Sequence, residues 1–215
     1  MTAPAHPDLT LYGDVYSGNC YKLILCCRAL GLKFDWHYVD ILKGESRTPE
    51  FLRLNPNGRI PLLATRDQHV LAESNAILSY LAAGSPLIPS ERWSHAQMLQ
   101  WQFFEQYSHE PAIAVARYIQ RYLGLPAHEQ ARHAACLPKG YAALDVMENH
   151  LTEHEFFVAG QYSLADISLY AYTHVADQGG FSLQAYPHIR NWLQRVQTQA
   201  GHISMDQAAA LYQPG

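Results

Sequence analysis

This 215-residue sequence has few charged residues and no long apolar run. Charged residues make up 16% and hydrophobic residues 48%, a balance that favours a packed globular core over disorder. The net charge is -4 and no basic run is present, so we expect neither nucleic acid nor an anionic membrane as a partner. No apolar stretch approaches the ~18 residues of a membrane-spanning helix, so none is predicted.

Cysteine is also scarce. Of the four cysteines, Cys20, Cys26 and Cys27 are clustered, and this pattern is not that of a disulfide framework. The first ten residues, MTAPAHPDLT, lack the basic and apolar regions of a signal peptide. We therefore predict a cytoplasmic protein in a reducing environment.

The first part of the chain alternates strands and helices. Residues 9–12 and 34–39 have strand patterns, and residues 20–30 between them have apolar positions at helical spacing. This βαβ unit predicts parallel strands with a right-handed crossover. Two further strands and a helix follow, separated by a hairpin at residues 66–69. Residues 1–85 are therefore predicted to form one α/β domain.

The rest of the chain, residues 91–215, is predicted to be all-helical. A long aromatic helix spans residues 93–123, and Pro111 should kink it. Ser163 and Asp166 have the spacing of a capping box before an apolar helix, so a structural role is predicted for both.

Turn-forming residues at positions 55–58 lead into Pro61 and the short apolar strand that begins at Leu62. Pro61 suits the start of a strand, and a cis Ile-Pro bond is reasonable beside a tight turn.

The next strand ends at Glu73, and Ser74 begins a helix. Backbone N–H groups at a helix start favour anions, and a carboxylate accepts from an ammonium. This corner suits a zwitterionic α-amino acid group, although a plain helix cap beside a solvated carboxylate is the alternative.

The segment from His150 to His154 matches the H-x-x-E-H pattern of some zinc proteases. It lies near a predicted helix end and no third ligand is evident. We therefore predict no metal site.

Taken in order, several short motifs resemble those of the cytosolic glutathione S-transferase family, in its bacterial, serine-type or theta-like form. They cover the chain from about Leu9 to Met205 and are LYG with SGN at residues 11–19, KGE at 43–45, RTPEF at 47–51, NPNG at 55–58, IP at 60–61, ESNAI at 73–77 and SLAD at 163–166. The resemblance implies a thioredoxin-like domain at residues 1–85 that binds glutathione. It also implies a helical domain at residues 91–215 that shapes the pocket of a small electrophilic or hydrophobic substrate. Homodimers are implied, and no metal cofactor.

The resemblance also implies a set of site residues. Ser17, at the start of the first helix, takes the place of the catalytic hydroxyl, and Pro61 has a structural role. The implied glutathione-binding residues are Ser17, Ser46, Arg59, Ile60, Glu73 and Ser74. Relatives often carry His or Gln where this chain has Ser46.

The physical demand on Ser17 is modest. Glutathione attacks as a thiolate, and a thiol of pKa ~8.5 is mostly protonated at neutral pH. Lowering that pKa by two units requires ~2.7 kcal/mol, which one hydrogen bond to a charged acceptor can supply at ~1.5–3 kcal/mol. By position alone, Ser17 is a helix cap.

Three neighbours compete for this role. They are Tyr12, expected inside the strand, Tyr16, expected to point elsewhere, and Cys20, expected to be a buried apolar thiol. The sequence thus favours a glutathione transferase. The alternatives are a glutathione-dependent disulfide reductase and a non-catalytic binding module.

Overall fold

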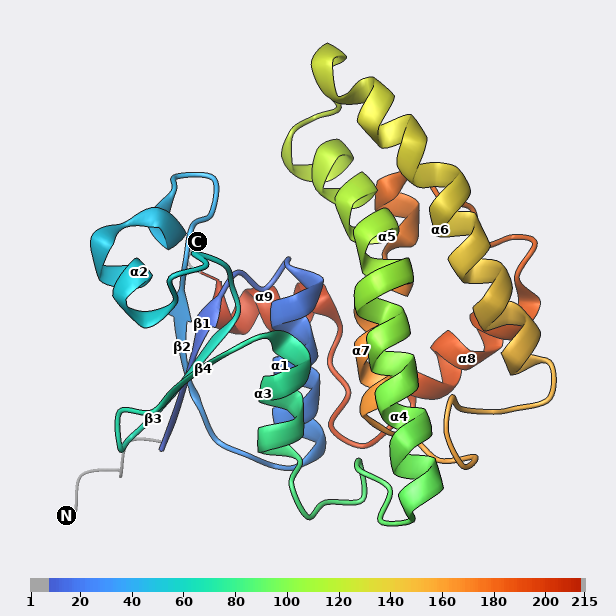
Figure 1. Ribbon diagram of the computed structural model, residues 1–215, viewed down its shortest axis with the longest axis horizontal. Coiled ribbons are helices and arrows are strands. Elements are labelled where there is room, and N and C mark those ends of the chain that lie inside the picture. Colours follow the sequence, from blue (N-terminus) through green and yellow to red (C-terminus); the bar gives the residue numbers. More distant parts are fainter. Residues whose placement is uncertain (1–7, 214–215) are drawn as a thin grey trace. The chain divides into compact units, whose positions relative to one another are not determined.

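The computed structural model describes residues 8–213, and these divide into two units (Figure 1). The first unit combines residues 8–85 with residues 200–213, and the second is formed by residues 86–199. No helix in the described part of the chain is long and apolar enough to cross a membrane. Residues 1–7, which the sequence assigned to the first domain, lie outside the described residues.

The first unit contains a four-stranded sheet in the order β2-β1-β3-β4. β1 pairs in parallel with β2, as predicted, and antiparallel with β3, which in turn pairs antiparallel with β4. The elements of this unit are β1 (Leu9–Gly13), α1 (Gly18–Ala29), β2 (Asp35–Tyr38), the 3-10 helix η1 (Glu45–Arg47), α2 (Pro49–Leu54), β3 (Leu62–Thr65), β4 (Val70–Ala72), α3 (Ser74–Leu81) and α9 (Met205–Tyr212). The thioredoxin-like fold implied by the resemblance is thus present.

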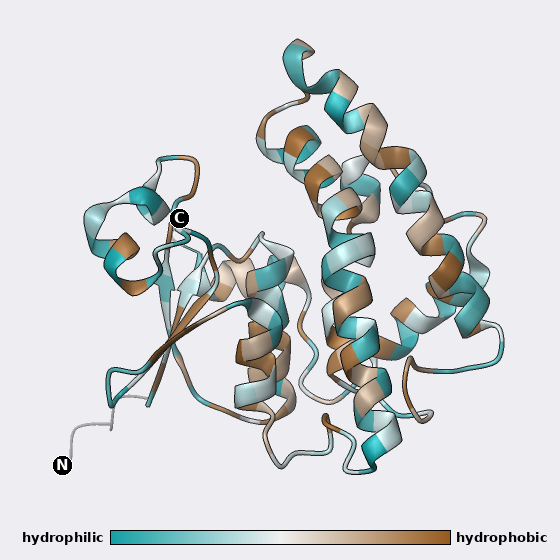
Figure 2. Cartoon of the chain, in the orientation of Figure 1, coloured by the Kyte–Doolittle hydropathy of each residue, from teal (hydrophilic) through white to brown (hydrophobic). Residues whose placement is uncertain are grey.

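Helices cover both faces of this sheet. α1 and α3 pack together on one face, where apolar residues follow both helices (Figures 1 and 2). On the other face, Phe51 of α2 packs with Val39 and Leu62, and Tyr12 packs against this cluster. Because successive side chains of a strand point to opposite faces, the buried Leu11 belongs to the α1 side and Tyr12 to the α2 side.

The second unit is helical. Its centre is α7, in which all ten residues are buried, as expected for a helix that is apolar on most sides. The elements are α4 (Arg92–Phe104), the π-helix η2 (Glu105–His109), α5 (Glu110–Arg117), the π-helix η3 (Tyr118–Tyr122), the 3-10 helix η4 (Ala127–Glu129), α6 (Gln130–Leu151), α7 (Leu164–Thr173), the 3-10 helix η5 (Ala176–Gly179) and α8 (Pro187–Gln197).

Pro111 disturbs the long aromatic segment in a specific way. The segment predicted as one kinked helix is divided, and the π-helix Glu105–His109 stands directly before α5. Proline lacks an N–H for the carbonyl four residues earlier, here Tyr107, and its ring crowds that carbonyl. A local π-helical turn accommodates this, so the distortion precedes the proline.

Residues 200–213 differ from the expectation that residues 91–215 form one helical domain. They group with the first unit. The ring of Tyr212 lies 5.2 Å from that of Phe34 and 6.0 Å from that of Trp36, and the Tyr21 hydroxyl donates to the Ile203 carbonyl. These contacts join segments far apart in the sequence, and helical periodicity cannot assign such a helix to one partner.

Candidate functional site

The sheet register brings three predicted site segments to one edge of the first unit. Tyr12 at the end of β1 pairs with Leu62 at the start of β3, and Leu62 pairs with Ala72 at the end of β4. The chain leaves β1 toward Ser17, enters β3 through Ile60 and Pro61, and leaves β4 at Glu73. The Ile60-Pro61 peptide bond is cis, as predicted.

Ser17 stands immediately before α1 in an extended conformation, with φ -73° and ψ 121°. Its N–H donates to the Asp14 carbonyl at 3.0 Å, and its carbonyl accepts from the N–H of Tyr21 at 2.9 Å. The Ser17 hydroxyl makes no capping bond to the helix; it hydrogen-bonds the Cys20 side chain instead. The hydroxyl is therefore not held by the helix backbone, and its partner in the structure is a side chain.

The three competitors of Ser17 lie in different surroundings. Tyr12 belongs to the α2 face, where its ring centroid lies 4.8 Å from that of His37. Burial raises the pKa of the Cys20 thiol to about 12, so this thiol remains protonated and unreactive at neutral pH. The Tyr16 N–H donates to Asp14 Oδ1 at 2.9 Å, which fixes the backbone beside Ser17.

Glu73 adopts a conformation that non-glycine residues rarely occupy, with φ 69° and ψ 114°. Its side chain is exposed and caps no helix N–H. Backbone of this kind costs on the order of 1–3 kcal/mol and is found preferentially at functional sites. Ser74, by contrast, is buried as the first residue of α3. The pair therefore presents an exposed carboxylate beside a helix start.

Two polar residues of α1, which the sequence analysis did not assign to the site, reach Ser74. The Ser74 hydroxyl donates to Asn19 Oδ1 at 3.4 Å. The fully buried Lys22 donates to Asn19 Oδ1 at 2.8 Å and to Ser74 Oγ at 3.3 Å. An available signal was the presence of a lysine on a helix whose other positions from Cys20 to Cys27 are mostly apolar. These bonds connect the Ser17 loop, through α1, to the start of α3.

Ser46 and Arg59 lie on two further segments that meet. Ser46 is buried in η1, and its carbonyl lies against Gly58, which has a φ of 60°. A side chain on Gly58 would clash with that carbonyl and with the Arg47 side chain. Arg59 is exposed, and its carbonyl accepts from Asn55 Nδ2 at 2.8 Å. The tight turn thus fixes the backbone that leads to Ile60 and leaves the guanidinium at the surface.

A cavity of about 480 Å³ lies on the α2 side of the first unit and contains none of the six predicted glutathione residues. Its walls combine aromatic rings with two carboxylates. The lining residues are Tyr12, His37, Tyr38, Val39, Glu45, Thr48, Glu50, Phe51 and Leu54.

The H-x-x-E-H segment forms a compact packing arrangement. The rings of His150 and His154 stack with centroids 4.2 Å apart, and His154 Nδ1 hydrogen-bonds the His150 carbonyl at 3.0 Å. Burial lowers the pKa of His150. Within residues 8–213, no group of three His, Cys, Asp or Glu side chains is arranged to hold a metal ion.

The predicted capping box at the start of α7 is present, with both of its reciprocal hydrogen bonds. Asp166 Oδ2 accepts from the N–H and the hydroxyl of Ser163, each at 3.0 Å. Asp166 Oδ1 accepts from Trp192 Nε1 at 3.0 Å and from the Phe157 N–H at 3.2 Å. Burial raises the pKa of Asp166 to about 6 even with these donors. The carboxylate is enclosed by protein groups, which agrees with a structural role.

Comparison with known proteins matches both units to domains of one family. The family model of the glutathione S-transferase N-terminal domain matches residues 16–83, and that of the C-terminal domain matches residues 96–200. A solved glutathione S-transferase from Pseudomonas fluorescens is 54% identical, with a TM-score of 0.90 and coverage of 92% of this chain and 98% of the other.

Glutathione transferases of lower sequence identity also match this chain. Glutathione S-transferase 3 of Zea mays is 32% identical over 87% of this chain and 88% of its own length. The glutathione transferase URE2P6 from Phanerochaete chrysosporium, solved in complex with oxidized glutathione, is 25% identical, with a TM-score of 0.82 and coverage of 95% and 97% of the two chains. The chain spans only 64% of the length of another curated relative, Protein URE2 of Eremothecium gossypii. With both domain models matched along most of its length, the chain belongs to the glutathione S-transferase family.

Proposed function

We propose that this protein transfers the thiolate of glutathione to small electrophilic molecules. The observation that carries the proposal is the sheet register, which brings the loop of Ser17, the cis-Pro61 turn and the Glu73-Ser74 corner to one edge of the sheet. A tripeptide with a reactive thiol and a zwitterionic end needs such groups on neighbouring segments. Family membership and the glutathione complex of the Phanerochaete relative support the choice of ligand.

In this proposal each end of glutathione meets matching chemistry. The exposed Glu73 carboxylate accepts from the γ-glutamyl ammonium, and the start of α3 at Ser74 accepts the γ-glutamyl carboxylate. Ile60 pairs its backbone with the cysteinyl unit, and Arg59, with the Ser46 segment beside it, lies toward the glycyl carboxylate. The Ser17 hydroxyl donates a hydrogen bond to the sulfur and favours the thiolate.

The reaction needs only a lowered thiol pKa and a positioned electrophile. The thiolate attacks the electrophilic carbon, a C–S bond forms, and the leaving group departs with its electron pair. The Ser17 hydroxyl donates a hydrogen bond throughout and is not consumed. Because burial keeps the Cys20 thiol protonated, the thiol of glutathione is the reacting thiol, which disfavours a disulfide reduction that uses a protein thiol.

The first test is the substitution Ser17→Ala. We expect glutathione affinity and thermal stability to be kept while turnover of an aryl halide falls by ~10²–10³, the loss seen when one donor to a developing anion is removed. Tyr12→Phe is the matched control, because it also removes one hydroxyl from this unit and should retain turnover. If Ser17→Ala remained active while Tyr12→Phe or Asn19→Ala was inactive, the assignment of Ser17 as the activating residue would be wrong.

Two assays separate the alternative functions. A transferase should be retained on immobilised glutathione and turn over an aryl halide, whereas a reductase should prefer a mixed disulfide of glutathione. Retention without either activity would indicate a binding module.

We also propose a cytoplasmic homodimer. All four cysteines are free and buried, which suits a reducing compartment. The second unit exposes three large aromatic side chains near one another in the sequence, Trp93, Phe103 and Tyr107, and such exposure is typical of an interaction surface. A sedimentation mass equal to one chain would exclude the dimer, and fractionation of cells tests the compartment.

A further inference from the structure

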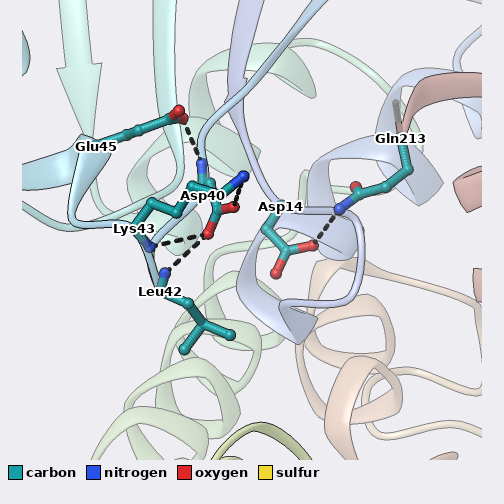
Figure 3. A network of polar contacts seen from close by, with 6 residues as sticks. All are labelled: Asp14, Asp40, Leu42, Lys43, Glu45 and Gln213. Atoms are coloured by element: carbon teal, nitrogen blue, oxygen red, sulfur yellow. Dashed lines mark hydrogen bonds and ion pairs between the residues drawn. The ribbon is translucent and has the colours of Figure 1, made fainter. Parts of the chain in front are cut away.

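The side chain of Gln213 reaches the loop that carries Ser17. Its Oε1 accepts from the Val15 N–H at 3.2 Å, and its Nε2 donates to Asp14 Oδ1 at 3.2 Å. Figure 3 shows the second of these bonds, with the amide directed at the Asp14 carboxylate. Gln213 and Val15 are separated by 198 residues, yet both belong to the first unit.

Together, Gln213 and Asp14 satisfy three successive backbone N–H groups. Val15 donates to Gln213, Tyr16 donates to the Asp14 carboxylate at 2.9 Å, and Ser17 donates to the Asp14 carbonyl at 3.0 Å. A loop before a helix has no strand partner to fix its backbone, so these bonds hold the backbone that carries Ser17. We call Gln213 with Asp14 the amide clasp.

The segment that carries Gln213 is itself anchored. Tyr212 packs on Phe34 and Trp36, and Arg28 Nε donates to the Gly201 carbonyl at 3.0 Å. Ser204 begins α9 with a capping box, in which its hydroxyl accepts from the Gln207 N–H at 3.2 Å. The amide of Gln213 is thus presented from a fixed element.

We propose that Gln213 is a positioning residue that orients the Ser17 loop for thiolate stabilisation, which makes residues 200–213 part of the active site. This inference rests on the proposed function of Ser17. A displacement of ~1 Å in a catalytic group can cost ~10² in rate, so a clasp that fixes three backbone groups has a measurable effect. The hydrogen bonds described for the clasp go to the Ser17 loop, so we expect it to affect glutathione affinity much less than the thiol pKa.

The test compares wild type with Gln213→Met, which keeps the length of the side chain but removes its hydrogen bonds to Val15, Asp14 and the Tyr38 side chain. The thiolate absorbance of bound glutathione is titrated against pH, and kcat and the glutathione KM are measured in parallel. We expect the pKa of the bound thiol to rise by about one unit and kcat to fall about tenfold, with KM changed less than twofold, since one unit corresponds to a tenfold ratio.

A charge swap gives a second, independent readout. Gln213→Glu keeps the acceptor for Val15 but sets a carboxylate against that of Asp14, so it should also raise the thiol pKa. Adding Asp14→Asn removes the repulsion and supplies an amide donor. The double variant should therefore recover most of the wild-type thiol pKa, and the difference from additivity measures the coupling.

Ser163→Ala is the control for a general loss of stability, because it removes a capping hydroxyl at α7 in the second unit without touching Gln213, α9 or the loop. It should lower the melting temperature and leave the thiol pKa unchanged. Gln213 variants that lower only the melting temperature would show that the clasp is a structural tether, which overturns the inference.

Ser17→Ala separates this failure from failure of the proposed function. If Ser17→Ala alone leaves the thiol pKa unchanged, the role of Ser17 is wrong and the inference falls with it. If Ser17→Ala raises that pKa, Gln213→Met should add little in the same background. A full additional shift there would mean that Gln213 acts by another route, and the inference is again overturned.

Discussion

Two helices of this protein begin with the same residue types, one serine and one carboxylate, and use them in opposite ways. At α7, Ser163 and Asp166 bond each other, and Asp166 also accepts from Trp192 and Phe157. At α3, Glu73 is exposed, makes no capping bond and has a φ of 69°.

The difference is between a carboxylate bonded within the protein and the carboxylate of the proposed glutathione site. The Asp166 carboxylate is fully buried and its acceptor positions are filled by protein donors. A buried, satisfied group stabilises the fold and offers nothing to a ligand. Glu73 retains its acceptor capacity at the surface on strained backbone, which lowers stability but leaves the carboxylate available.

The largest expected effect is on the capping box of α7. Asp166→Ala removes the acceptor for four donors, and each buried donor costs ~1–3 kcal/mol when left unpaired. We expect a loss of about 3 kcal/mol or more in the free energy of unfolding, measured by urea denaturation. Glutathione affinity of the folded fraction should be unchanged. Unaltered stability together with lost turnover would place Asp166 in the chemistry instead.

The next largest effect concerns the Glu73-Ser74 corner. Glu73→Gln keeps the shape of the side chain but removes the charge proposed to pair with the γ-glutamyl ammonium. It should weaken glutathione binding by roughly tenfold to a hundredfold, which is the low end of the scale for truncated charge pairs. Ser74→Ala should weaken binding as well. Calorimetric titration measures both losses.

Cysteinylglycine, which lacks the γ-glutamyl group, sharpens this test. It should bind the wild type weakly and lose little further in either variant. Asp67→Asn, an exposed carboxylate change in the hairpin of the same unit, is the matched control and should bind both ligands as the wild type does. Equal losses for the two ligands would mean that the corner is only a helix cap.

The smallest effect tests the strain itself. Glu73→Gly should raise the free energy of unfolding by about 1 kcal/mol, because glycine adopts a positive φ without the steric cost. The same variant should bind glutathione at least as weakly as Glu73→Gln. A variant that is less stable than wild type would show that Glu73 makes a stabilising contact, and the contrast with Asp166 would lose its basis.

Local signals predicted much of the fold and part of the candidate site. The βαβ unit, the cis Ile60-Pro61 bond and the α7 capping box follow from short patterns, and the structure contains all three. Asn19 and Lys22 were not assigned to the site, because only the packing of α1 against α3 brings them to Ser74.

By itself, the sequence determined what depends on neighbours along the chain: where helices start, where the chain turns, and the motif order that matches one family. Tertiary structure alone decided which distant segments meet. No periodicity within residues 200–213 indicates that Tyr212 packs on Phe34 and Trp36 or that Gln213 holds the loop of Ser17. The physical reason is that a hydrogen bond across 198 residues depends on the folded path of the chain, whereas a cap or a turn depends only on the few residues that form it.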